Sequence, residues 1–266
     1  DRSSLEKLFK DYDFDVVVHF AAESHVDTSI INPGSFIDTN IVGTFNLLDI
    51  SKNYIADNNL DQNNFRFHHI STDEVYGSLS AADPSFKETN KYFPNSPYSA
   101  SKASSDHLVR AYFHTFGMPI TISNCSNNYG PFQDNEKLIP KIIDMCKKNE
   151  SIPIYGDGKN VRDWLYVEDH CEAIDCIIKN GTVGETYNVG GECELNNLQI
   201  VDYILSSINN NLKFHTDSQI KFVTDRAGHD FRYSVNIDKI KKDLDWNPKT
   251  LFLDGLAKTL NHYFDV

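Results

Sequence analysis

Three runs of β-branched and aromatic residues, separated by helical patterns, organise the first half of the chain. The runs cover residues 15–22, 65–71 and 120–124. Continuous apolar runs of this length are typical of buried parallel strands. One helical pattern opens after Asn32-Pro33 and another opens at Ser96-Pro97, where a proline favours the first turn of a helix. Strands joined by such helices predict crossover units, so we expect an α/β fold with a doubly wound parallel sheet.

The pattern changes after Asn124, where the strand patterns become shorter and the loops rich in Gly, Asn and Asp. Strands are predicted at residues 152–155, 164–167 and 186–189, and helices at residues 198–208 and 251–263. This pattern predicts a smaller C-terminal α/β lobe packed against the sheet. We therefore expect two parts, residues 1–125 and residues 126–266, with some segments of the second part returning to the sheet.

The composition of the chain excludes some classes of binding partner. The 266 residues carry 38 acidic and 25 basic side chains, a net charge of −13, so we expect no nucleic acid and no anionic membrane as a partner. The apolar stretches are far shorter than the ~20 residues that cross a bilayer. The five cysteines form no CxxC pair, which predicts reduced thiols and no metal site. No cationic segment followed by an apolar one opens the sequence, so we expect no signal peptide and a cytoplasmic location.

A tyrosine and a lysine lie four residues apart near the start of the second predicted helix. This spacing places Tyr98 and Lys102 on one face of the helix. A cation beside a phenol favours the phenolate, so we expect a lowered pKa that would let Tyr98 act as a general base. The short pattern is also compatible with a Tyr and a Lys on an exposed helix surface.

A hydroxyl and two adjacent carboxylates end the second predicted strand, at Thr72, Asp73 and Glu74. The carboxyl ends of parallel strands are where open sheets bind ligands. Mutual repulsion between paired carboxyls raises the pKa of one of them, which separates an acid from a base. A turn or a helix cap is the alternative interpretation, although a cap would explain only one of the two acids.

Together these motifs resemble the extended short-chain dehydrogenases/reductases, and within them the dTDP-glucose 4,6-dehydratase family. The resemblance rests on residues 19–27 (HFAAESHVD), 71–77 (STDEVYG), 98–102 (YSASK), 124–131 (NCSNNYGP), 163–170 (DWLYVEDH), 225–230 (DRAGHD) and 244–248 (LDWNP). The YxxxK pattern is shared by the whole superfamily, whereas Thr-Asp-Glu is the specific part. The resemblance implies a Rossmann-type sheet in residues 1–125, with NAD as cofactor, and a nucleotide-sugar lobe in residues 126–266.

The resemblance also implies a reaction, in which C4 of the hexose is oxidised, water is eliminated across C5 and C6, and the hydride returns to C6. Tyr98 would take the proton of the 4-hydroxyl, with Lys102 stabilising the phenolate and Thr72 hydrogen-bonded to that hydroxyl. Glu74 would remove the proton from C5, and Asp73 would protonate the departing 6-hydroxyl.

The ligand-binding residues are implied by the same resemblance. Those expected to bind NAD are Phe20, Ala21, Ala22, Ser24, Thr39, Tyr98, Lys102 and Asn128. Those expected to bind the dTDP-sugar are Ser24, Asn127, Lys137, Leu138, Ile139, Pro140, Pro153, Ile154, Tyr155, Arg162, Asn197, Asp225, Arg226 and His229. Tyr155 would lie near the base, and the two arginines near the diphosphate. A homodimer through the helices that begin near Pro33 and Ser96 is also implied.

Two features depart from the family pattern. Ala227 stands where the family usually has Pro, and no GxxGxxG turn for the NAD pyrophosphate occurs in the sequence. We therefore expect the sheet to be N-terminally incomplete, without the first βαβ unit of roughly 30 residues. The alternatives that remain open are a UDP-glucose 4,6-dehydratase, a nucleotide-sugar epimerase, and a noncatalytic nucleotide-sugar-binding protein.

Overall fold

A computed structural model of the chain describes residues 1–212 and 214–264. Its centre is a four-stranded parallel sheet in the order β1-β2-β3-β7. These strands are β1 (Val16–His19), β2 (Arg66–Thr72), β3 (Ile120–Cys125) and β7 (Thr186–Val189). The parallel sheet predicted from the sequence is confirmed. The strand at residues 186–189 comes from the second half of the chain and pairs with β3.

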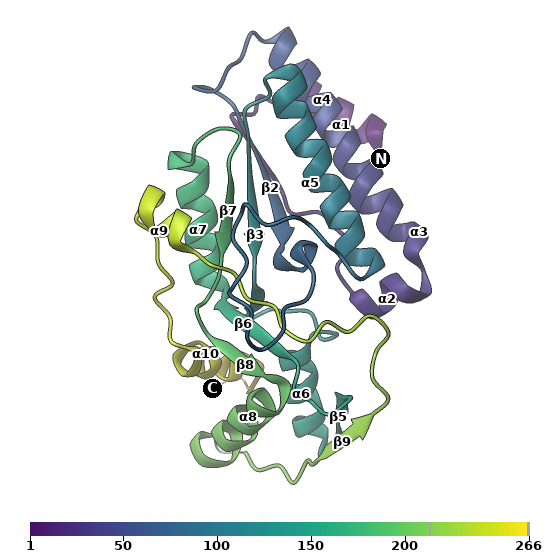
Figure 1. Cartoon of the computed structure of the whole chain (residues 1–266), viewed down its shortest axis with the longest axis vertical. Coiled ribbons are helices and arrows are strands. Elements are labelled where there is room, and N and C mark those ends of the chain that lie inside the picture. Colours follow the sequence, from purple (N-terminus) through teal and green to yellow (C-terminus); the bar gives the residue numbers. More distant parts are fainter. Residues whose placement is uncertain (213, 265–266) are drawn as a thin grey trace.

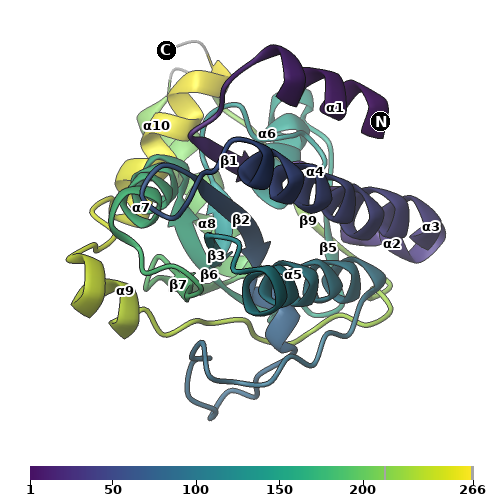
Figure 2. The same cartoon turned by 90° about the horizontal axis from the view of Figure 1, so that it is seen from above.

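Helices cover both faces of this sheet (Figures 1 and 2). On one face lie α1 (Arg2–Asp11), α2 (Val26–Ile31), α3 (Pro33–Phe36), the π-helical segment η1 (Ile37–Gly43), α4 (Thr44–Asp57) and α5 (Pro97–Phe116). On the other lie α7 (Val167–Asn180) and α9 (Asp238–Leu244). Phe67, Ile120 and Val109 are buried between the sheet and the first group of helices. The helix predicted to open after Pro33 is thus present, interrupted by the π-helical segment.

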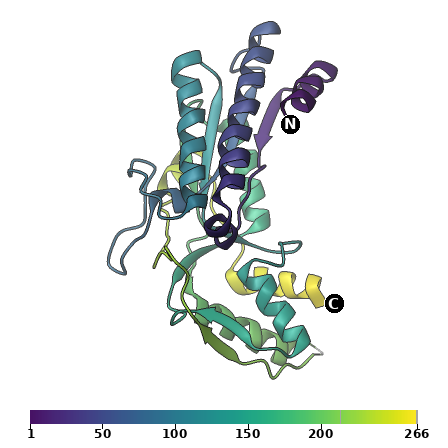
Figure 3. The same cartoon turned by 90° about the vertical axis from the view of Figure 1, so that its right-hand side faces the viewer.

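The remaining elements form a lobe at the carboxyl ends of the sheet strands (Figure 3). They are β4 (Asn127–Tyr129), α6 (Leu138–Lys148), β5 (Ile152–Tyr155), β6 (Val161–Tyr166), β8 (Glu194–Asn196), α8 (Asn197–Asn211), β9 (Ile220–Val223) and α10 (Phe252–Phe264). Strand β6 lies between β4 and β8, and β5 pairs with β9. The predicted strand at 164–167 begins earlier than expected, and Val167 already belongs to α7.

The lobe has its own apolar core, in which side chains of α6 and α8 pack against β5 and β6. The described residues contain no helix that is both long and apolar enough to cross a bilayer.

Candidate active site

The candidate site lies where β2 ends and α5 begins. Strand β2 leads into the 3-10 turn η2 (Asp73–Tyr76), and the hydroxyl of Thr72 accepts a hydrogen bond from the backbone N–H of Glu74 at 3.3 Å. Thr72 therefore caps this turn, and Asp73 and Glu74 are its first residues. The hydroxyl of Thr72 also lies 3.3 Å from Oδ1 of Asp73, whereas Oδ2 of Asp73 and Oε2 of Glu74 have no hydrogen-bond partner among the described residues. Helix α5 starts with a capping box between Ser96 and Ser99, and this start fixes the turn that carries Tyr98.

Asp73 is buried and Glu74 is half-buried, and the surroundings of the two carboxylates differ. Burial and the neighbouring charge of Glu74 raise the pKa of Asp73 well above its ordinary value, with a further contribution from Asp163. Burial also raises the pKa of Glu74, but the cations Arg162 and Arg226 oppose this shift. The prediction of a raised carboxyl pKa is confirmed. Asp73 is the group more readily kept protonated, and Glu74 the group more readily ionised.

The pKa of Tyr98 corrects our expectation from the sequence. It is raised well above the ordinary value, because the phenol is buried and faces the carboxylate of Glu74. Lys102 does not offset this effect: its ammonium donates to the backbone carbonyl of Ile70 at 2.7 Å. The lowered pKa predicted from the YxxxK spacing is therefore wrong for the chain without ligands, since burial and the adjacent acids outweigh the cation.

A cleft of about 460 Å³ opens beside Glu74, between the sheet and the lobe. The residues of the predicted substrate set that line it are Ser24, Asn127, Lys137, Leu138, Pro153, Ile154, Tyr155, Arg162, Asn197, Arg226 and His229. Ile139 and Pro140 are buried instead, with Ile139 in the lobe core. Asp225 does not line the cleft but lies 2.6 Å from Nδ1 of His229, which does.

Asp27 of α2 is a lining residue that the sequence did not single out. Its carboxylate accepts a hydrogen bond from the hydroxyl of Tyr155 at 2.9 Å and lies 3.4 Å from the guanidinium of Arg226. Asp27 was part of the family-like run at residues 19–27, but its role depends on β5 and on the loop of Arg226, which are distant in sequence. No pattern in the sequence could have brought these three residues together.

Tyr233 is a second such residue, and it supports Arg162. The guanidinium of Arg162 lies 4.3 Å from the centre of the Tyr233 ring and donates to the backbone carbonyl of Asp230 at 3.0 Å. The ring and the carbonyl hold a buried cation beside Glu74, where its charge favours the ionised carboxylate.

The residues expected to hold NAD surround the carboxyl ends of β1 to β3. Phe20 is 58% exposed at the end of β1, followed by the small side chains of Ala21 and Ala22. Among the described residues, no hydrogen-bond partner reaches the buried Oγ of Ser126 or Oδ1 of Asn127. An open strand end with small side chains and unpartnered polar atoms fits a cofactor that carries amide and hydroxyl groups.

Three other residues of the expected NAD set have defined environments. The amide of Asn128 donates to the carbonyl of Ser126 at 3.0 Å, and its Oδ1 lies 2.8 Å from Nδ1 of His170. Thr39 is half-buried in η1, and Ser24 is exposed, where its hydroxyl lies 3.3 Å from the ammonium of Lys137. Ser24 therefore borders both the strand ends and the cleft.

A parallel sheet with a Tyr/Lys helix and polar residues at its carboxyl edge defines the class of extended short-chain dehydrogenases/reductases. Comparisons agree with this class, because the family model described as GDP-mannose 4,6 dehydratase matches residues 1–259. The dTDP-glucose 4,6-dehydratase of Xanthomonas campestris is 50% identical over 99% of this chain and 76% of its own length. The dTDP-glucose 4,6-dehydratase 1 of Escherichia coli is 48% identical over 99% of this chain and 76% of its own length.

Solved structures give the same result. DesIV, a dTDP-glucose 4,6-dehydratase of Streptomyces venezuelae solved with NAD bound, matches with a TM-score of 0.90 and 41% identity, over 100% of this chain and 77% of that one. The chain belongs to the dTDP-glucose 4,6-dehydratase family, as the resemblance in the sequence predicted.

Proposed function

We propose that this protein converts dTDP-glucose to dTDP-4-keto-6-deoxyglucose with NAD as cofactor. The observation that carries the proposal is the carboxyl pair at the end of β2, beside the cleft, in which the pKa of Asp73 is raised further than that of Glu74. Elimination of water across C5 and C6 needs a base for a proton and an acid for a leaving hydroxyl. Asp73 and Glu74 supply both groups from adjacent positions.

The first step is oxidation at C4. Tyr98 takes the proton of the 4-hydroxyl, which the hydroxyl of Thr72 holds in place. NAD, held by the residues at the carboxyl ends of β1 to β3, would supply the acceptor for the hydride of C4 and the donor for C6. Because the pKa of Tyr98 is raised in the chain without ligands, a positive charge is needed beside the phenol when substrate is bound. Lys102 lies on the same helix face, and to supply that charge its ammonium would turn from the carbonyl of Ile70 toward the phenol.

The second step is elimination. The 4-ketone acidifies C5, Glu74 takes the C5 proton, and Asp73 gives its proton to the 6-hydroxyl, which leaves as water. The proton on Glu74 exchanges with solvent, and hydride addition at C6 together with delivery of a solvent-derived proton from Glu74 to C5 completes the turnover. The net change is the loss of one water. Tyr98 releases to solvent the proton that it took from the 4-hydroxyl, and Asp73 regains a proton from solvent.

The cleft beside Glu74 holds the nucleotide part of the substrate in this proposal. Arg162 and Arg226 offer guanidinium groups suited to diphosphate oxygens, and Tyr155 offers an aromatic face for the base. We assign NAD to the part formed by residues 1–125 and the nucleotide-sugar to the part formed by residues 126–266. A cytoplasmic location is supported by the five cysteines, all of which are free thiols.

A homodimer through the helices on one face of the sheet is also part of the proposal. Solvent-exposed apolar side chains lie along this surface. Ile31 on α2 is 85% exposed, and Ile37 and Val42 on η1 and Phe45 on α4 are also exposed. Phe116 lies exposed at the end of α5, which runs beside α4 in Figure 2. An exposed apolar surface of this kind favours association with a second copy.

The function is tested by incubating the protein with NAD and dTDP-glucose and following the product by NMR, with UDP-glucose and GDP-mannose as parallel substrates. We expect a 4-keto-6-deoxy sugar from dTDP-glucose at a much higher kcat/KM than from the other two. Formation of a 4-epimer, or binding of dTDP-glucose without any turnover in the presence of NAD, would contradict the proposal.

A further inference from the structure

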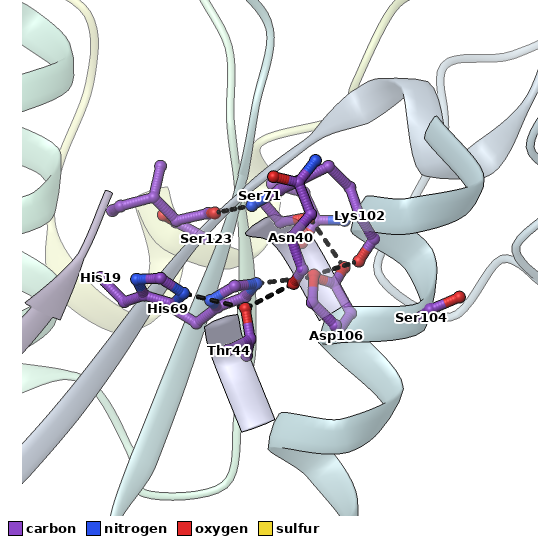
Figure 4. Close-up of polar contacts among 12 residues, drawn as sticks. His19, Asn40, Thr44, His69, Ser71, Lys102, Ser104, Asp106 and Ser123 are labelled. Atoms are coloured by element: carbon purple, nitrogen blue, oxygen red, sulfur yellow. Dashed lines mark hydrogen bonds and ion pairs between the residues drawn. The ribbon is translucent and has the colours of Figure 1, made fainter. Parts of the chain in front are cut away.

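Asp106 is a buried carboxylate that the reaction just described does not use. It lies on α5 one turn after Lys102 and is fully buried. Its Oδ2 accepts hydrogen bonds from the hydroxyls of Ser71 and Tyr92, both at 2.9 Å. Its Oδ1 lies 3.2 Å from Nε2 of His69. Figure 4 shows His69, Ser71 and Lys102 gathered around this carboxylate.

These contacts tie the helix that carries Tyr98 to the strand that carries the acid pair. Ser71 directly precedes Thr72, so its bond to Asp106 anchors the last residues of β2 on α5. The bond from Lys102 to the carbonyl of Ile70 is a second connection between the same two elements. Polar contacts from Lys102 and from Asp106, one turn later on α5, therefore fix the position of Tyr98 on this helix relative to the acid pair at the end of β2.

The charge of Asp106 is as relevant as its hydrogen bonds. Lys102 is buried, which lowers the pKa of its ammonium, and Asp106 is the first group that opposes this shift. Three other titratable groups face Lys102 from the sheet. Burial lowers the pKa of His69 on β2 to about 4 and that of His19 on β1 to about 2, and it raises the pKa of Cys125 on β3 to about 12. All three are uncharged near pH 7.

Asp106 itself is held ionised. Burial opposes ionisation of Asp106, but the imidazole of His69 at 3.2 Å, the charge of Lys102 and the hydrogen bond from Ser71 together lower its pKa. The two phenols near it, Tyr92 and Tyr76, are neutral, because burial raises their pKa far above the ordinary value. Arg110 donates to the hydroxyl of Tyr92 from the far side. The carboxylate of Asp106 is therefore the negative charge that favours the protonated form of Lys102.

Packing alone does not explain a carboxylate here. A buried charge costs free energy that apolar side chains of similar size avoid, and replacing buried ionic groups by well-packed apolar ones is often neutral or stabilising. The position lies between a helix and a sheet, where Val109 and Tyr112 on the same helix are already buried. An ionised group at this position points to a role in the reaction.

We propose that Asp106 is a positioning residue for the dehydratase reaction, which keeps Lys102 charged and fixes α5, the helix that carries Tyr98, against the end of β2. The proposal rests on the proposed function, because it assigns Lys102 the task of stabilising the Tyr98 phenolate. It adds a group that does not itself touch substrate or cofactor.

The test compares Asp106→Asn, an isosteric change that removes the charge, with Ser71→Ala, which removes one hydrogen bond and keeps the charge. For Asp106→Asn we expect a roughly 10²-fold lower kcat, an unchanged KM for dTDP-glucose, and an alkaline limb of the kcat profile displaced to lower pH, because Lys102 loses its proton more readily. For Ser71→Ala we expect a smaller fall in kcat with the alkaline limb in place. Asp175→Asn, in an exposed pair with Lys179 on α7, is the matched control and should behave as wild type.

A second readout does not depend on turnover. In protein labelled with ¹⁵N-lysine, the signal assigned to Lys102 by its loss in Lys102→Arg should titrate at lower pH in Asp106→Asn than in wild type. An unchanged Lys102 titration together with an unmoved alkaline limb would overturn the proposal, even if stability falls.

Two further outcomes are separable. If Asp106→Asn does not fold, a kcat of Ser71→Ala equal to that of wild type overturns the alignment part of the proposal. If wild type does not turn over dTDP-glucose, the proposed function fails, whatever the titration of Lys102 shows.

Discussion

The hydroxyl of Tyr155 donates a hydrogen bond to Oδ2 of Asp27 at 2.9 Å, joining β5 of the lobe to α2 on the sheet. The other oxygen of the same carboxylate lies 3.4 Å from the guanidinium of Arg226. An anion thus occupies one side of the cation that we assign to the diphosphate. A bound diphosphate would therefore either share the guanidinium of Arg226 with the carboxylate of Asp27 or displace that carboxylate from Arg226.

Removing this charge should strengthen binding of an anionic nucleotide. Asp27→Asn keeps an oxygen that accepts from Tyr155 but removes the negative charge beside the diphosphate position. A charge interaction of about 1 kcal/mol corresponds to a change of about fivefold in Kd. We expect calorimetric titration with dTDP to give a Kd about fivefold lower. Asp202→Asn, on the exposed side of α8, is the control, and weaker binding by Asp27→Asn would refute this account of Arg226.

The buried acid Asp73 should lower the stability of the fold at neutral pH. Its pKa is raised in the folded chain, so its contribution to stability is fully present below the unfolded pKa of 3.8 and is lost as pH rises through the folded pKa. Asp73→Asn cannot ionise, so the variant does not lose this stability as the pH rises. We expect a higher Tm than wild type at pH 7, by roughly 2–4 °C for each kcal/mol relieved, and a difference that shrinks toward pH 4.

Asp106 provides the matched comparison, because its folded pKa is lowered. Its contribution is present above the unfolded pKa and is lost as pH falls, so Asp106→Asn should melt below wild type at pH 7. Thermal melts at pH 4, 5, 6 and 7 check both signs. The same sign for the two variants would contradict the assigned charge states.

Tyr98 should be required for oxidation at C4 and not for binding. Tyr98→Phe removes the oxygen that accepts the 4-hydroxyl proton, so we expect kcat to fall by roughly 10²–10⁴-fold. The Kd for dTDP, measured by titration, should stay within twofold of wild type, because the nucleotide lies in the cleft away from α5 in this account. Turnover near the wild-type rate would exclude Tyr98 as the proton acceptor.

Much of the fold could be predicted because strand and helix patterns are local. The strand at residues 152–155 has the predicted bounds, and α5 begins after the predicted Ser96. The carboxylate pair at the end of β2 was also visible, because its chemistry depends on two adjacent residues. The resemblance to the dTDP-glucose 4,6-dehydratase family then gave the catalytic roles of these residues, which their spacing alone did not determine.

What the sequence could not provide depends on burial and on long-range contacts. The pKa of Tyr98 moves in the direction opposite to our prediction, because the desolvation of a phenol beside Glu74 is a property of the folded site. Asp27 meets Tyr155 across 128 residues of chain, and Asp106 meets Ser71 across 35. Neither contact follows a periodicity that a sequence pattern could reveal.

The central claim is that Glu74 takes the C5 proton and returns one from solvent, and a single experiment in D₂O tests it. The protein is incubated with NAD and dTDP-glucose, and the product is examined by NMR and mass spectrometry. We expect one deuterium at C5 and none at C6 with wild type. With Glu74→Gln, which keeps the size of the side chain but removes the base, product formation should fall by roughly 10²–10⁴-fold. A product that keeps its original hydrogen at C5, or Glu74→Gln turning over at the wild-type rate, would contradict the account.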